Sequence, residues 1–282
     1  MPRSGGSAEE AQAIAENARA YDAIAGTYDA AHAEIFNPTE QARLARAVGD
    51  ALAACVGGTP PPSVLDVGAG TGNLTAHFLA AGAAVVSADI SAECLRVVEQ
   101  RFATTGRHAV QRINGRTLAM FADNSFDVAA CYSVLHHVPD YLALVAEMAR
   151  VVRRGGVVFI DHERHDASWH DPRREQFMQE AWVFPPKRWT RFVDPRRYWR
   201  RIRPLLEWKR WRNPRWMPEG DLHIWPDDHI EWAQVEAHAR AHGVEPVLVR
   251  DYLLYDAHFD AAVWEQWRHH ITDYRMWIGR KA

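Results

Sequence analysis

The sequence predicts an α/β protein built on a doubly wound, parallel sheet. Strand-like and helix-like segments alternate through residues 63–163, and the strand-like segments are continuously apolar. Such strands are buried on both faces, because helices cover both sides of a parallel sheet. A glycine-rich turn within VLDVGAGTGNL, residues 64–74, follows the first of these strands, at the edge where doubly wound sheets bind ligands.

Local signals place each element along the chain. The Ala-rich segment 8–30 is helical in character, and a second helix follows Pro38, with Thr39 as its cap, and stops at Gly57. Further helices are predicted at 73–82, 91–102, 141–156 and 228–243. Strands are predicted at 63–67, 83–90, 108–113, 126–134, 157–163, 244–254 and 274–281.

The composition indicates a globular protein of the cell interior. Hydrophobic residues make up 48% of the 282 residues and the formal net charge is −3. No apolar run reaches the roughly 18 residues that a membrane span needs, and the N-terminus lacks the apolar region of a secretory signal. Cys55, Cys94 and Cys131 are scattered without metal-ligand spacing, as expected for buried thiols in a reducing compartment. We expect a cytoplasmic protein that does not contact a membrane.

The glycine turn predicts a binding site for a ligand that contains ribose. Glycines at alternate positions let backbone N–H groups approach a ligand closely, because no Cβ atom is in the way. The spacing is Gly-x-Gly-x-Gly, and Asn73 stands where a dinucleotide-binding turn has its third small residue. Asp89 ends the second strand, where a carboxylate can accept hydrogen bonds from both ribose hydroxyls.

These motifs resemble those of the class I S-adenosylmethionine-dependent methyltransferases. The resemblance covers about residues 20–163 and, more loosely, 228–282, and it is closest to the small-molecule branch that includes quinone C-methyltransferases. The segments that carry it are YDAIAGTYD, VLDVGAGTGNL, VVSADIS, DNSFDVAACYSVLHHVPD and RGGVVFIDHE. The resemblance implies a seven-stranded, mostly parallel sheet with an antiparallel last strand, and S-adenosylmethionine as cofactor.

The resemblance also implies cofactor-binding residues. They are Tyr21, Tyr28, Asp66, Gly68, Gly70, Gly72, Asp89, Ile90, Asn114, Gly115 and Ser133. The three turn glycines would approach the methionine portion, Asp66 its amino group, and the two tyrosines would cap that end. Asp89 would bind the ribose, Ile90 would lie against the adenine, and Ser133 would lie beneath the sulfonium.

The chain departs from the family at the adenine. The family often has Gly-Asp after the third strand, and the Asp recognises the adenine amino group. Here Asn114-Gly115 occupies that place, so the carboxylate is missing. Asn114 or a backbone carbonyl is expected to replace it.

The candidates for proton transfer lie past the fourth and fifth strands. They are His136, His137, Asp161, His162 and Glu163. A base is needed only when the methyl acceptor is a hydroxyl, a protonated amine or an acidic carbon. Strand alternation predicts that Asp161 and Glu163 share a site while His162 faces away. The alternative is that the His136-His137 pair is only a turn feature, and no metal site is expected.

A basic, aromatic segment follows the fifth strand. Residues 187–216 carry twelve basic and two acidic side chains, and all twelve tryptophans lie at or beyond Trp169. We therefore divide the chain into an N-terminal helical lid (1–58), a cofactor-binding core (59–163), an inserted substrate cap (164–227) and a C-terminal completion of the sheet (228–282). The cap composition suits a nucleic-acid surface, a lid over an aromatic or anionic small molecule, or plain helical packing.

The predicted function is methyl transfer from S-adenosylmethionine to a small molecule, such as an aromatic or anionic natural-product intermediate. The fourth strand ends in CYSVLHHV, not in the Asn/Asp-Pro-Pro-aromatic motif of nucleic-acid amino-methylating enzymes, and the net charge is negative. The alternatives are an RNA or DNA methyltransferase and a protein that binds S-adenosylmethionine without methylating. The Trp-rich tail is also compatible with a homodimer surface.

Overall fold

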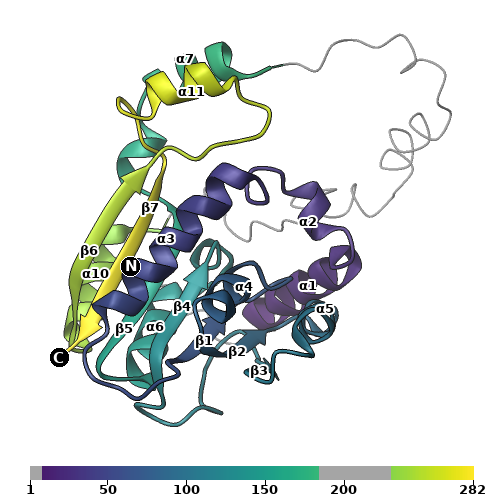
Figure 1. Ribbon diagram of the computed structural model, residues 1–282, viewed down its shortest axis with the longest axis vertical. Coiled ribbons are helices and arrows are strands. Elements are labelled where there is room, and N and C mark those ends of the chain that lie inside the picture. The colour runs from purple at the N-terminus through teal and green to yellow at the C-terminus, as the bar shows by residue number, and fades with distance from the viewer. Residues whose placement is uncertain (1–7, 184–229) are drawn as a thin grey trace, which may run out of the picture.

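The computed structural model describes residues 8–183 and 230–282, in which seven strands form one sheet in the order β3-β2-β1-β4-β5-β7-β6 (Figure 1). The strands are β1 (Ser63–Val67), β2 (Ala84–Asp89), β3 (His108–Arg112), β4 (Phe126–Tyr132), β5 (Val152–Arg164), β6 (Val244–Tyr252) and β7 (Tyr274–Lys281). Neighbours from β3 to β5 pair in parallel, and β7 is antiparallel to both β5 and β6. The prediction of a seven-stranded, mostly parallel sheet with an antiparallel last strand is confirmed.

Helices surround this sheet. The described ones are α1 (Ala8–Ile24), α2 (Tyr28–Ala31), α3 (Pro38–Ala54), α4 (Asn73–Ala80), α5 (Ala92–Phe102), α6 (Tyr141–Val151), α7 (Arg173–Ala181), α10 (Trp232–Ala241) and α11 (Ala261–Trp267), with short 3-10 helices η1 (Leu135–His137) and η2 (Asp166–Trp169). The predicted cap of α3 was wrong: Asn37 caps this helix, and its side chain accepts a hydrogen bond from the backbone N–H of Glu40.

Strand β5 begins earlier than predicted. The helix predicted to reach residue 156 ends at Val151, and β5 starts at Val152, which pairs with Phe126. Gly155 has φ +76, and a Cβ atom there would lie 2.4 Å from the carbonyl oxygen of Val56. Gly155 therefore lets the backbone of β5 approach the segment after α3 closely, and the double glycine does not end the helix.

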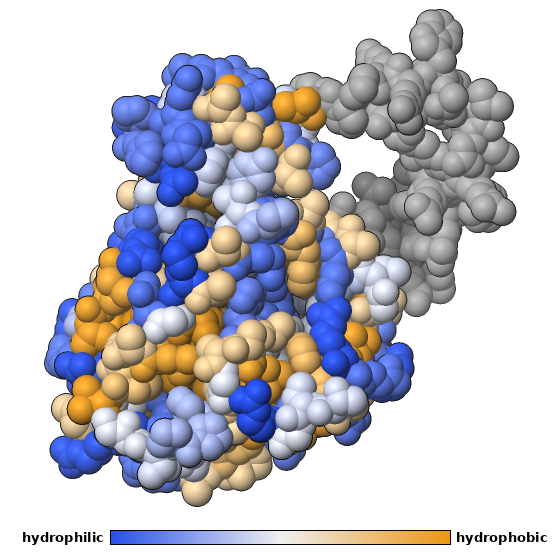
Figure 2. All heavy atoms as spheres, in the orientation of Figure 1, coloured by the Kyte–Doolittle hydropathy of each residue, from blue (hydrophilic) through white to orange (hydrophobic). Residues whose placement is uncertain are grey.

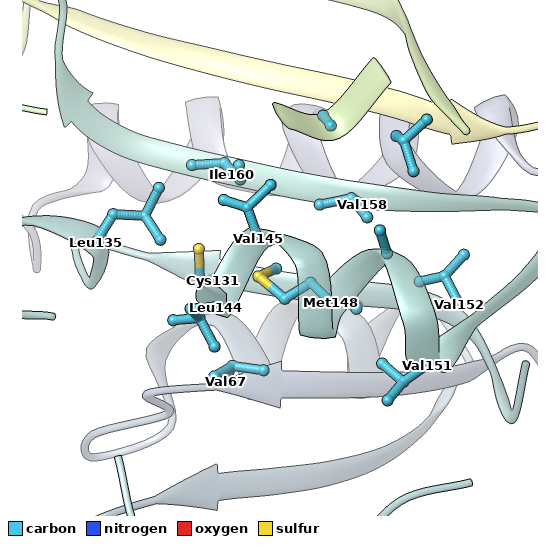
Figure 3. Close-up of a cluster of buried hydrophobic side chains, with 14 of the residues drawn as sticks. Val67, Cys131, Leu135, Leu144, Val145, Met148, Val151, Val152, Val158 and Ile160 are labelled. Carbon is cyan, nitrogen blue, oxygen red and sulfur yellow. The ribbon is translucent and has the colours of Figure 1, made fainter. Parts of the chain in front are cut away.

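Two buried clusters sandwich the sheet. On one face, α6 begins at Asp140, whose side chain accepts a hydrogen bond from the N–H of Ala143, and it packs Val145 and Met148 against Ile160 of β5 (Figure 3). On the opposite face, α3 and α4 cover the apolar side chains of β1, β4 and β5. Each such side chain stabilises the fold by about 1.5–3 kcal/mol when it is fully buried. The sheet is thereby held between two helical layers, with its strand ends aligned along one edge.

Several helices lie outside the predicted cofactor-binding core. Helix α1 lies against α5, where the Asp22 carboxylate accepts hydrogen bonds from the Ser91 hydroxyl and the Glu93 N–H. Helices α7 and α11, which were not predicted, form a smaller cluster around Phe177 and Trp264, beyond the ends of β6 and β7 (Figure 1). The domain division stays a prediction, and residues 184–227 of the predicted cap lie outside the described part of the chain.

The surface carries apolar residues near the sheet edge. Figure 2 shows orange side chains at the lower left, in the region where Figure 1 places α3 and the ends of β6 and β7. The edge strand β6 exposes Val247 and Val249. A homodimer stays a prediction. Among the described helices, none has the length and apolar character that crossing a membrane requires.

Candidate functional site

A cleft opens at the carboxyl ends of β1, β2 and β4 and has an empty volume of about 1120 Å³, including its mouth. Most of the predicted cofactor-binding residues line it: Tyr21, Tyr28, Asp66, Gly68, Gly70, Asp89, Ile90, Gly115 and Ser133. The remaining two, Gly72 and Asn114, are not among the lining residues. Sequence reasoning therefore placed one site from five separate segments of the chain.

The glycine turn brings backbone close to the cleft. Gly68 has φ +70, and a Cβ atom there would lie 2.5 Å from a methyl group of Val134. Gly70 has φ +51 and faces open space. Gly72 instead faces α5, because its missing Cβ would lie 2.9 Å from the Phe102 ring. This glycine therefore allows close helix packing, and its contact with the methionine portion stays a prediction.

Two buried carboxylates lie in the cleft. The Asp89 side chain accepts hydrogen bonds from the N–H groups of Gly70 and Ser91, both at 2.8 Å. The Asp66 side chain accepts one from the Thr75 hydroxyl at 2.6 Å. Burial raises the pKa of Asp66 to about 7 and also raises the pKa of Asp89. Such carboxylates favour a ligand that brings hydroxyl donors and a positive charge into the cleft.

Two asparagines in the cleft have unused hydrogen-bonding capacity. Asn73 accepts a hydrogen bond from the Gln41 side chain at 2.8 Å, whereas its Nδ2 donor is buried without a partner among the described residues. Asn17 of α1 is 4% exposed, and its Oδ1 is likewise unpaired within that part of the chain. Buried polar atoms without partners are rare in folded proteins, so both point to a ligand. Sequence reasoning noted Asn73 only as a departure from another motif and missed Asn17.

These groups fit S-adenosylmethionine. An amino-acid ammonium suits Asp66, a carboxylate suits the Asn73 amide N–H, and ribose hydroxyls suit Asp89. Residues 65–160, which include these aspartates and the glycine turn, match the family model described as a methyltransferase domain. Residues 65–160 of this chain therefore form a methyltransferase domain. Its cofactor is S-adenosylmethionine.

Comparison with known proteins supports this assignment. The chain is 34% identical over 151 residues to a demethylmenaquinone methyltransferase of Renibacterium salmoninarum. This alignment covers 53% of this chain and 60% of that protein. The chain is also 34% identical over 105 residues to a ubiquinone biosynthesis O-methyltransferase of Nitrosomonas europaea, covering 37% and 45%. The chain thus spans about half the length of the curated relatives it matches.

A solved structure shares the fold of the methyltransferase domain and its flanking elements. A chain in the complex between the Haloferax volcanii Trm112 methyltransferase activator and a methyltransferase aligns with a TM-score of 0.56 at 15% identity. The alignment covers 92% of this chain and 96% of that chain. At this identity the likeness shows the fold alone.

A second pocket adjoins the cofactor cleft, and we call it the acceptor pocket. Its lining residues are Tyr21, Tyr28, His32, Glu34, Ile35, Ser133, His136, His137, His162, Glu163, Arg164, Trp169 and Tyr274. It shares Tyr21, Tyr28, Ile35, Ser133 and His137 with the cofactor cleft. The two spaces are therefore adjacent and share one wall.

A histidine–carboxylate pair lies in the acceptor pocket. Glu163 is 1% exposed, and one of its oxygens accepts hydrogen bonds from the N–H groups of Val134 and Leu135 at 2.7 and 2.6 Å. Its other oxygen lies 2.8 Å from Nδ1 of His136. With Nδ1 donating to Glu163, the neutral His136 ring carries its lone pair on Nε2. His137 lies beside it, with Nε2 3.2 Å from the Tyr21 hydroxyl.

The structure separates Asp161 from Glu163, which corrects the predicted alternation. The pairing of β5 with β7 shifts between Ile160 and Glu163, and His162 has φ +62, so an irregular residue interrupts the strand. Asp161 is fully buried and bonds Arg43 of α3 at 2.9 Å and the Tyr252 hydroxyl at 3.1 Å. Asp161 therefore anchors a helix to the sheet, whereas Glu163 lines the acceptor pocket.

His162 and Asn114 also differ from the predictions. His162 lies in the wall of the acceptor pocket, with its ring stacked between Tyr132 and Tyr274 at centroid distances of 4.6 and 4.3 Å. Burial lowers the pKa of His162 well below its usual range, so the ring is neutral. Asn114 is exposed and turns its Oδ1 toward the backbone N–H groups of its own loop.

The remaining predictions concern metals and the basic segment. Within residues 8–183 and 230–282, no group of three His, Cys, Asp or Glu side chains is arranged to hold a metal ion. The basic segment 187–216 lies outside the described residues.

Proposed function

We propose that this chain transfers a methyl group from S-adenosylmethionine to a small molecule bound in the acceptor pocket. The observation that carries the proposal is the common wall: the cofactor cleft and the acceptor pocket meet at Tyr21, Tyr28, Ser133 and His137. When bound, S-adenosylmethionine supplies a methyl group already activated by its sulfonium. The protein then has to align the acceptor and exclude water.

The cofactor cleft binds and orients. Asp89 accepts hydrogen bonds from the ribose hydroxyls of the cofactor, and Asp66 offsets the positive charge of its ammonium group. The Asn73 amide donates a hydrogen bond to the cofactor carboxylate. Helices α1 and α2 carry Tyr21 and Tyr28 over both spaces, so residues 8–31 act as a lid. This arrangement keeps water away from the methyl group.

The acceptor pocket holds the base. Because Nδ1 of His136 donates its hydrogen bond to Glu163, Nε2 of this ring takes the proton from the acceptor. Loss of that proton makes the acceptor atom nucleophilic enough to attack the methyl group. Glu163 then stabilises the imidazolium, and the backbone N–H groups of η1 keep this carboxylate in place. A hydroxyl, a protonated amine or an acidic carbon needs such a base, so we infer an acceptor of one of these types.

The lining of the pocket favours an aromatic, anionic acceptor. The rings of Tyr28, Trp169 and Tyr274 offer stacking surfaces, and the Arg164 guanidinium, 4.8 Å from the Trp169 ring, can pair with a carboxylate or phosphate. The names of the two relatives, both from quinone biosynthesis, are compatible with a ring-shaped acceptor.

The test is a labelling experiment with a matched variant. The protein is incubated with methyl-labelled S-adenosylmethionine and an extract of its host, and label is counted in small-molecule, nucleic-acid and protein fractions. We expect label among small molecules with the wild type and, at a cofactor concentration well below its dissociation constant, about tenfold fewer counts with the Asp89→Ala variant. Label confined to nucleic acid, or none in any fraction while cofactor binding is intact, contradicts the proposal.

A further inference from the structure

Asn17 is a buried polar residue that the proposed transfer does not use. It lies on α1, one helical turn from Ile14, and both side chains line the cofactor cleft. The Asn17 side chain is 4% exposed, and its Oδ1 atom is fully withdrawn from solvent. No described residue donates to this oxygen. Leaving such an acceptor unpaired costs about 1–3 kcal/mol, which a ligand donor would recover.

Apolar side chains lie near Asn17, at the end of the cleft where α1 meets the loop after β3. A Cβ atom on Gly115 would lie 3.0 Å from a methyl group of Ile14 and 3.1 Å from one of Ile90, so these three residues meet at one end of the cleft. This end differs from the part that holds Asp66 and Asn73, where polar groups gather. A flat aromatic ring with a polar edge suits the apolar end, and the adenine of the cofactor is such a ring.

We propose that Asn17 recognises the adenine by accepting a hydrogen bond from its exocyclic amino group at Oδ1. The inference rests on the proposed use of the cofactor in this cleft. It assigns the specificity for the base to helix α1, and thus to the same segment that carries the lid tyrosine Tyr21.

Asn114, the residue of the loop after β3 at the position that the sequence favours, is not a side-chain alternative. Asn114 is exposed, and its Oδ1 already accepts hydrogen bonds from the N–H groups of Arg116 and Thr117 at 2.9 and 3.0 Å. Asn114 therefore closes its own turn. The two asparagines form a matched pair for an experiment, because one lies in the cleft and the other lies outside it.

The test measures binding of two product analogues by titration calorimetry. One is S-adenosylhomocysteine, and the other is its 6-deamino analogue, in which purine replaces adenine. We expect the wild type to bind the adenine form about tenfold more tightly. The Asn17→Ala variant should lose this preference by weakening only for the adenine form, and Asn114→Ala should keep it. Thermal unfolding of each variant checks that the fold is intact.

Each other outcome overturns the assignment. Equal binding of the two analogues by the wild type shows that the amino group is not recognised, whether or not a variant folds. A preference that survives Asn17→Ala, or disappears in Asn114→Ala, places recognition elsewhere. If the wild type binds neither analogue, the proposed cofactor site itself fails, and that result is distinct from a loss of base preference alone.

Discussion

The cofactor cleft and the acceptor pocket share a wall but are built in different ways. The centre of the cleft is formed by backbone at strand ends and by Asp66 and Asp89, and residues of α1, α2 and the end of β4 complete it. The acceptor pocket gathers side chains from α1, α2, η1, the end of β5 and the start of β7. This difference agrees with the two tasks proposed above, which are cofactor binding in the cleft and acceptor binding in the pocket.

The largest expected effect sharpens this separation on the acceptor side. His136→Ala removes the base, so kcat should fall by about 100-fold or more, while the dissociation constant of the cofactor stays within about twofold. Steady-state rates with labelled cofactor and calorimetric binding measure the two quantities. Glu163→Gln should lower kcat in the same direction, because the ring loses its carboxylate partner. A weakened cofactor affinity in His136→Ala would instead show that the two spaces do not function independently.

The second-largest expected effect is a loss of cofactor affinity. Asp89→Ala removes the acceptor for the ribose hydroxyls, so the affinity for S-adenosylmethionine should drop at least tenfold, or about 1.4 kcal/mol. Calorimetric titration measures the change. Thermal unfolding provides the control, because Asp89 also holds the N–H groups of Gly70 and Ser91. Unchanged affinity in a folded variant removes Asp89 from the site.

The pH dependence of cofactor binding tests Asp66. Burial raises its pKa to about 7 in the free protein, and the ammonium of the cofactor favours the ionised carboxylate. Binding therefore releases a proton, and the affinity should rise with pH up to about 7 and then level off, with a limiting slope of about tenfold per pH unit below 7. Calorimetry in two buffers of different ionisation enthalpy counts the proton. Asp66→Asn should flatten the profile, and an unaltered slope would argue against this residue.

The smallest effect concerns the lid over both spaces. The Asp29 carboxylate of α2 accepts hydrogen bonds from the Thr71 hydroxyl in the glycine turn and from Arg101 of α5, both at 2.5 Å. Arg101→Ala removes this partly exposed ion pair and the hydrogen bond that Arg101 donates to the Thr71 carbonyl at 2.9 Å, so the cofactor should dissociate about two to five times faster. Stopped-flow displacement measures this rate. Arg96→Ala should leave it unchanged, because the partners of Arg96 among the described residues are Glu93 and Gln100 of the same helix.

The sequence predicted the cleft well because its determinants are local. The glycine turn, the acidic strand end and the apolar strands each carry their own signal, and they converge through parallel topology alone. Asn17 was missed because a helix residue far from the motif gives no local sign of facing a ligand. The separation of Asp161 from Glu163 was missed because strand alternation assumes regular backbone, and the left-handed residue between them breaks it. Most of the predicted cap, residues 184–227, lies outside the described residues, so the cap stays a prediction.

The irregular residue His162 has a consequence for how such an enzyme diversifies. Up to Asp161, β5 pairs with β4 and belongs to the interior of the sheet, and from Glu163 onward its described pairing is with β7 alone. Changes beyond this point therefore leave the register of the central strands intact. Substitutions at the acceptor end of β5 can therefore alter the acceptor pocket without displacing the strands that hold the cofactor cleft.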